Sequence, residues 1–115
     1  MKLYHGGVKG LKPGDRVLPP SATGVEHGGG GEHQQRYRPT RVYVTRFRWY
    51  AELFAHLHGG EVYEVRAHDP RPDLDARGSF WCPFARVVRV AVPAPVALPV
   101  EADRFAWLSV ALGRD

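Results

Sequence analysis

Three places along the chain carry side chains of types that do chemistry, each in or beside a strand-like segment. His5 precedes two glycines in Tyr-His-Gly-Gly, Tyr43 lies in Arg-Val-Tyr-Val-Thr, and Asp73 and Asp75 share the stretch Pro-Asp-Leu-Asp. Because glycines let a large group approach the backbone, His5 could face a ligand. Each residue also has a structural explanation: an exposed histidine, a tyrosine in cross-strand packing, or aspartates that cap a turn.

The composition limits the classes of protein to consider. A chain of 115 residues predicts one domain with one core, residues 1–115. The net charge of +4 suits an anionic ligand, from a dinucleotide to a nucleic acid. No apolar stretch is long enough to span a bilayer, and the first residues lack a signal pattern. The lone cysteine, Cys82, is expected to be a small core residue. We therefore expect a cytoplasmic protein without a membrane partner.

Local patterns predict the elements that must position these side chains. Apolar residues spaced by three and four predict a helix over 47–58, which Gly59 and Gly60 end. Alternation and β-branched residues predict strands, and prolines mark an edge strand. The expected strands are 2–5, 41–45, 61–67, 84–92 and, at the edge, 96–100; a closing helix is expected at 101–112. Residues 21–39, with four consecutive glycines, are expected to form a mobile loop, and 68–78 a second loop. One secure helix among strands predicts an α+β fold with a mainly antiparallel sheet.

The histidines do not predict a metal site. His56 and His58 are two residues apart, so on a helix their side chains diverge by about 200°. His27 and His33 flank the glycine run without two further ligands at suitable spacing. The sequence also lacks a phosphate-binding loop of the Walker or Rossmann type and a nucleophile elbow. We therefore expect no metal cofactor.

Several short blocks, taken in order, resemble the rifamycin ADP-ribosyltransferases over about residues 3–92. The opening Y-H-G-G-V-K-G-L-K-P-G-D is similar to that family's H-G-T segment and the Leu-x-x-Gly-Asp turn after it, with Gly7 where the family has threonine. R-V-Y-V-T resembles the strand that carries the family's catalytic tyrosine, and W-Y-A-E-L-F-A its Ala-Glu-Leu helix. E-V-Y-E-V-R-A-H-D-P-R-P-D-L-D resembles the strand and acidic loop with the catalytic aspartate, and S-F-W-C-P-F-A-R-V-V-R-V a later strand.

The resemblance implies a small split antiparallel sheet with one or two helices and a particular activity. It implies an NAD-dependent mono-ADP-ribosyltransferase that cleaves the nicotinamide–ribose bond without a metal, with antibiotic resistance among its roles. The acceptor is left open between a rifamycin-type small molecule, a protein and a nucleic acid. The implied catalytic residues are His5, Tyr43 and Asp73, with Asp75 as the alternative carboxylate. The implied NAD contacts are His5, Gly6, Gly7, Arg16, Tyr43, Thr45 and Tyr50.

The resemblance also implies a role for each residue. His5 would hydrogen-bond ribose hydroxyls, and Gly6 would offer backbone groups to the nicotinamide amide. Tyr43 would stack on the nicotinamide ring, because an aromatic face holds a flat cation. Asp73 would stabilise the positive charge that develops on the ribose. Arg16, or an arginine between 36 and 48, would bind the pyrophosphate.

Two other classes of protein remain open from the sequence. One is a catalytically inactive domain of the same fold that binds NAD or another nucleotide, or serves as an interaction module. The other is a small basic nucleic-acid-binding domain, because arginines are densest between Arg36 and Arg48.

Overall fold

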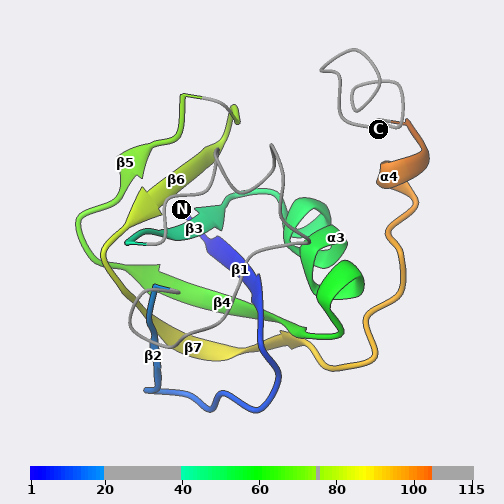
Figure 1. Cartoon of the computed structure of the whole chain (residues 1–115), viewed down its shortest axis with the longest axis horizontal. Coiled ribbons are helices and arrows are strands. Elements are labelled where there is room, and N and C mark those ends of the chain that lie inside the picture. Colours follow the sequence, from blue (N-terminus) through cyan, green and yellow to red (C-terminus); the bar gives the residue numbers. More distant parts are fainter. Residues whose placement is uncertain (20–39, 75, 105–115) are drawn as a thin grey trace.

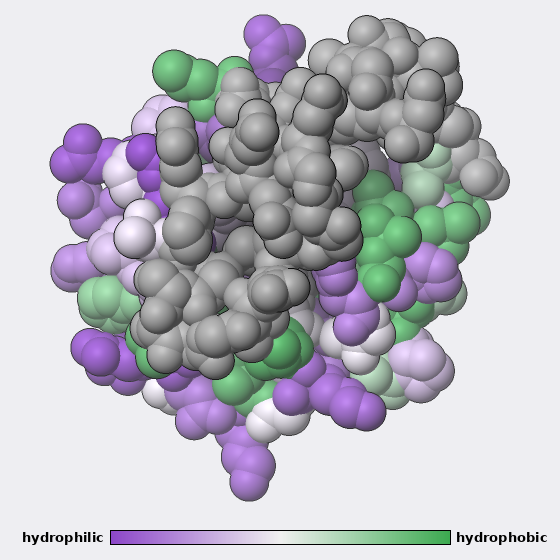
Figure 2. Space-filling view, viewed as in Figure 1, coloured by the Kyte–Doolittle hydropathy of each residue, from purple (hydrophilic) through white to green (hydrophobic). Residues whose placement is uncertain are grey.

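The computed structural model describes residues 1–19, 40–74 and 76–104. The strands are β1 (Leu3–Gly7), β2 (Arg16–Val17), β3 (Val42–Thr45), β4 (Glu61–Ala67), β5 (Arg71–Pro72), β6 (Ser79–Cys82) and β7 (Ala85–Val92), and the helices are α3 (Arg48–His58) and α4 (Glu101–Arg104). Among the described residues the strands form one sheet in the order β2-β7-β4-β1-β3-β6-β5, with every pairing antiparallel (Figure 1). The predicted α+β class with an antiparallel sheet is confirmed. Hydrophilic side chains cover the left and lower edges of the same view (Figure 2).

Helix α3 forms where the apolar spacing predicts it and packs against the middle of the sheet. Ala51 and Ala55 are its buried residues, and their small side chains let the helix lie close to β1 and β4. Gly59 ends the helix with a φ of 68°, a left-handed conformation that glycine adopts without steric cost. The N–H of Gly60 then donates to the Ala55 carbonyl at 2.8 Å.

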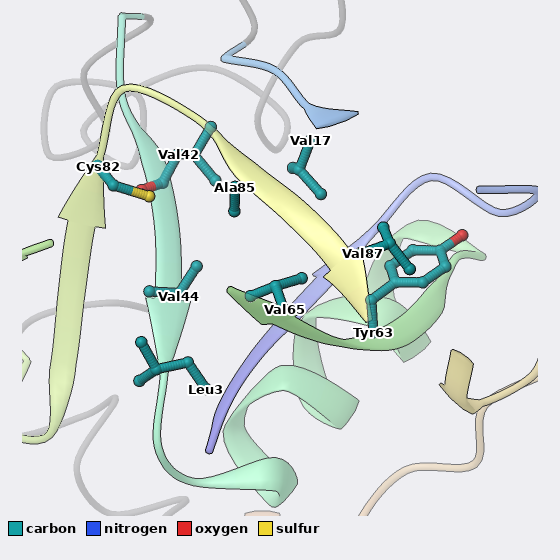
Figure 3. Close-up of a cluster of buried hydrophobic side chains, with 9 residues drawn as sticks. All are labelled: Leu3, Val17, Val42, Val44, Tyr63, Val65, Cys82, Ala85 and Val87. Atoms are coloured by element: carbon teal, nitrogen blue, oxygen red, sulfur yellow. The ribbon is translucent and has the colours of Figure 1, made fainter. Parts of the chain in front are cut away.

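The main core is enclosed by the sheet itself. Alternation along the strands puts Val42 and Val44 of β3, and Tyr63 and Val65 of β4, on the same side of the sheet. Side chains of β3 and β6 meet those of β4 and β7 across this core, so the sheet curves around it (Figure 3). The buried set is Leu3, Val17, Val42, Val44, Tyr63, Val65, Cys82, Ala85 and Val87.

A second, smaller cluster lies on the other side of the sheet, under helix α3. It joins Ala51 and Ala55 to Val62 of β4 and to Val96 from the segment after β7. The edge strand predicted at 96–100 is wrong, because this segment has no strand pairing. Pro99 within this segment, and Pro93 and Pro95 just before it, lack the N–H groups that a ladder needs. Val96 is buried against the helix instead.

Three further boundaries differ from the sequence predictions. Strand β1 continues through Gly6 and Gly7, because both pair with β4, so His5 lies inside the strand. Strand β6 starts at Ser79, before the predicted strand at 84–92, because it pairs with all four residues of β3. The short strand β5 pairs with β6 inside the predicted loop 68–78.

Two other predictions fall wholly or partly outside the described residues. The loop predicted at 21–39 lies outside them entirely, and the closing helix predicted at 101–112 lies outside them after residue 104. In the described ranges no helix is long and apolar enough to cross a membrane.

A polar pair at the start of β4 fixes the loop that follows β1. The Glu61 carboxylate accepts hydrogen bonds from the backbone N–H of Gly10 at 3.0 Å and of Ala94 at 2.8 Å. These bonds hold the pKa of Glu61 below its ordinary value, because they stabilise the charged form. The Tyr63 hydroxyl donates to the carbonyl of Val8 at 2.6 Å, and burial raises the pKa of Tyr63. The loop is therefore tied to the sheet by side chains of β4.

Candidate functional site

A cleft opens where strands β1 and β3 separate. In the described part of the chain the two strands share one residue pair, Tyr4 with Thr45. By contrast, β1 pairs with β4 over its whole length, to Gly7 opposite Glu61. The ladder between β1 and β3 therefore ends after Tyr4, although β1 continues for three more residues.

Four parts of the fold line this cleft. Helix α3 closes one side with residues spaced so that they share a face, namely Tyr50, Phe54 and His58. The enclosed volume is about 60 Å³, and the unfilled space including the open mouth is about 550 Å³. A ligand larger than a few water molecules would therefore extend out through the mouth. The lining is completed by Tyr4, His5 and Gly6 of β1, Tyr43, Val44 and Thr45 of β3, Ala51 of α3, and Asp73 and Ser79.

His5 bridges the two strands where the ladder ends. Its Nδ1 lies 2.8 Å from the carbonyl oxygen of Tyr43. A carbonyl can only accept, so Nδ1–H donates, and in the neutral ring Nε2 carries the lone pair. A Cβ atom at Gly7 would collide with Nε2 of His5. Because Gly7 has no side chain, the imidazole of His5 can lie along the strand and donate its hydrogen bond to the Tyr43 carbonyl.

Gly6 brings the helix onto the strand. A Cβ at this position would collide with the carbonyl oxygen of Ala51 and would lie 3.0 Å from the backbone nitrogen of Ala55. Both atoms belong to the helix backbone, so α3 can rest on β1 here only because residue 6 has no side chain. This close approach places Tyr50 and Phe54 at the cleft, where their rings meet edge to face with centroids 5.0 Å apart.

Thr45 has a structural role beside the cleft. Its buried hydroxyl accepts from the N–H of Phe47 at 3.1 Å, just before α3 begins. It also lies 3.4 Å from the carbonyl of Gly78, to which it donates. The hydroxyl thus links the start of the helix to the turn before β6. Thr45, which the family resemblance implies as an NAD contact, thus uses its hydroxyl in two hydrogen bonds within the chain.

Asp73 enters the cleft from the turn between β5 and β6. Its backbone N–H donates to the Ser79 carbonyl at 2.9 Å, and the Ser79 N–H donates to Ala76 at 3.0 Å. These bonds hold the turn closed and fix the position of the Asp73 backbone. Asp75, the alternative carboxylate, lies outside the described residues. Of the two aspartates, the described residues include only Asp73, and it lines the cleft.

Ser79 lines the cleft and was missed by the sequence analysis. It is 6% exposed, and its Oγ has no hydrogen-bond partner among the described residues. Because a buried hydroxyl without a partner costs free energy, this atom is suited to bind a polar group of a ligand. Sequence reasoning missed it because β6, with four residues, is too short to show a clear alternation of apolar and polar side chains. Phe54 and His58 were also missed as cleft residues.

Two other residues named from the sequence lie elsewhere. Arg16 is on β2 opposite Arg86, with its guanidinium 4.5 Å from the Phe84 ring centroid, and it does not line the cleft. Of the two helix-end histidines, His58 faces the cleft whereas His56 contacts the carbonyl of Val96 at 2.9 Å. Their side chains diverge, as their spacing predicts.

Cys82 is not part of the cleft. It is fully buried in the main core, 3.7 Å from the Val42 carbonyl, and burial raises its pKa to about 11. It is the core residue that the sequence predicts. No group of three His, Cys, Asp or Glu side chains that could hold a metal occurs within the described ranges.

Comparison with known proteins identifies no family for this chain. No protein-family model, no curated protein and no solved structure matches the chain.

Proposed function

We propose that the chain is an NAD-dependent mono-ADP-ribosyltransferase whose active site is the cleft between β1 and β3. The observation that carries the proposal is the convergence of His5, Tyr43 and Asp73, from three separate segments, on one cleft. Thr45 and Tyr50, two further residues that the family resemblance implies, line it as well. The end of the β1–β3 ladder next to these side chains supports a split sheet of the ADP-ribosyltransferase type.

The side chains of the cleft suit cleavage of a nicotinamide–ribose bond. As the C1′–N bond breaks, nicotinamide leaves with the bonding pair and positive charge develops on the ribose. The Asp73 carboxylate stabilises that charge, and an acceptor nucleophile then bonds to C1′ and loses its proton to water. The aromatic rings of Tyr43 and Tyr50 hold the flat pyridinium ring. Nε2 of His5 accepts a hydrogen bond from a ribose hydroxyl, since the Nδ1–H donates to the Tyr43 carbonyl.

The test is release of nicotinamide from NAD labelled in that ring. The wild-type chain is expected to release nicotinamide slowly without an acceptor. Asp73→Asn should lower the rate by about 10²-fold or more, because it removes the charge that stabilises the ribosyl cation. Asp69→Asn is the matched control, since Asp69 is exposed and does not line the cleft. Tyr43→Ala should also abolish release, and circular dichroism verifies that each variant folds.

The outcomes separate the classes of protein left open by the sequence. Release that depends on Asp73 and Tyr43 supports the transferase and makes an acceptor screen, with rifamycin first, the next step. An NAD-dependent rise in melting temperature without release would indicate a nucleotide-binding domain. Equal rates in Asp73→Asn and Asp69→Asn would contradict the site.

A further inference from the structure

A row of aromatic and cationic side chains runs from the cleft to the edge of the sheet. Trp81 on β6 lies directly opposite Tyr43 of β3 on one side and opposite Arg71 of β5 on the other. Residues directly opposite in antiparallel strands point to the same face, with Cβ atoms about 5 Å apart. The row therefore continues outward from Tyr43, which lines the cleft.

Two guanidinium groups lie over the Trp81 ring. The Cζ atom of Arg41 is 3.8 Å from the indole centroid, and that of Arg71 is 5.9 Å from it. A guanidinium stacked on an indole keeps its N–H groups in its own plane, at the rim of the stack, where they can bind an anion. We call Arg41, Trp81 and Arg71 the Arg–Trp strip.

The positive charge of the strip is only weakly balanced. Within the described ranges Arg41 has no carboxylate within ion-pair distance, and Arg71 has only Asp69 at 3.8 Å. The side chains of Arg71 and Asp69 are 63% and 68% exposed, so water screens that pair. Figure 2 shows hydrophilic side chains along the left edge of the molecule, the side on which β5 lies in Figure 1.

We propose that the Arg–Trp strip binds single-stranded nucleic acid beside the cleft. Guanidinium groups bind phosphate oxygens, and a guanidinium that lies on an indole can stack its outer face on a base. The strip combines both on one sheet face, so it matches a chain in which phosphates and flat bases alternate. A duplex hides its base faces, so an unpaired strand is the better fit. The proposal does not depend on transferase activity, because binding alone is sufficient to test it.

The test is fluorescence anisotropy with a labelled oligothymidylate of about 12 nucleotides, titrated at several salt concentrations. Trp81→Leu keeps an apolar side chain without the flat ring and should weaken binding about tenfold or more. Arg71→Gln should lower the slope of log affinity against log salt by about 0.7, the value for one phosphate contact on a single strand. Arg66→Gln is the matched control, because Arg66 is also exposed but lies on β4, opposite Arg86.

The results expected and those that overturn the proposal are distinct. Weaker binding in Trp81→Leu and Arg71→Gln, with Arg66→Gln like wild type, supports the strip. Equal losses in Arg71→Gln and Arg66→Gln would overturn it, because the binding would then follow net charge alone. No binding at low salt would also overturn it. If Trp81→Leu left oligonucleotide binding unchanged but raised the KM for NAD in nicotinamide release, the strip would instead hold the adenosine diphosphate half of NAD, and the proposal would be wrong.

Nicotinamide release by a chain that fails to bind the oligonucleotide would leave the proposed transferase standing. The two proposals therefore fail separately.

Discussion

The adjacent glycines of β1 allow one substitution to be compared at two positions with different neighbours. A methyl group at Gly6 meets the backbone of α3, whereas at Gly7 it meets the imidazole of His5. The Ala51 carbonyl cannot move by itself, because it belongs to the backbone of α3, whose buried residues Ala51 and Ala55 pack against the sheet. A histidine side chain can rotate away. Gly6→Ala should therefore destabilise the fold, and Gly7→Ala should mainly disturb the cleft.

The magnitudes follow from these contacts. Overpacking costs about 1–3 kcal/mol, and we take about 3 kcal/mol at Gly6 because the whole helix must shift. Replacing glycine with alanine restricts the unfolded chain and returns about 0.4–1 kcal/mol, which leaves a net loss of about 2 kcal/mol. At Gly7 the rotated ring loses the bond from Nδ1 to Tyr43, which is worth about 1 kcal/mol. The same entropic gain nearly cancels that loss, so Gly7→Ala should be within about 0.5 kcal/mol of wild type.

The assay is urea denaturation followed by circular dichroism, with the free energy of unfolding extrapolated to water. Gly7→Ala should in addition reduce nicotinamide release, because His5 no longer lies in place. A stability loss in Gly7→Ala as large as that in Gly6→Ala would refute the assignment of their neighbours. An unchanged stability in Gly6→Ala would show that the helix does not rest on the bare α-carbon.

Three further predictions concern buried and charged groups outside these glycines. Ser79→Ala removes a buried hydroxyl that has no partner among the described residues. The free energy of unfolding should therefore stay level or rise by about 1 kcal/mol, while the affinity for NAD falls. A large loss of stability in urea would contradict this. Because the pKa of Glu61 is lowered in the folded state, its stabilising effect is complete above its ordinary value of 4.5 and is lost as pH falls through the lowered pKa. Glu61→Gln should therefore flatten the acid side of a stability–pH curve, and an unchanged acid side would count against the two backbone bonds. Cys82 has its pKa raised to about 11, so a thiol reagent at about pH 8 should label it only after unfolding in guanidinium chloride. Fast labelling of the native chain would show that the thiol is not in the core.

Much of the local structure could be predicted because its causes lie close together in the sequence. The helix over Arg48–His58 follows from apolar spacing and from the glycines after it, and strand β4 follows from alternation. Strand β6 was missed because four residues give too little pattern, and it exists through its pairing with β3. The error at 96–100 arose because apolar valines suit a strand, whereas the prolines beside them prevent a ladder.

The sequence alone determined the α+β class, because periodicity and turn chemistry are local properties. The resemblance of short sequence blocks to a known family identified His5, Tyr43 and Asp73 as residues that could share a site. Only the tertiary structure decided that these three residues line one cleft, that Arg16 lies away from it, and that Ser79 belongs to it. Those outcomes depend on where the ladder between β1 and β3 ends and on how closely α3 approaches Gly6. Both result from packing between segments far apart in the chain, which no local pattern encodes.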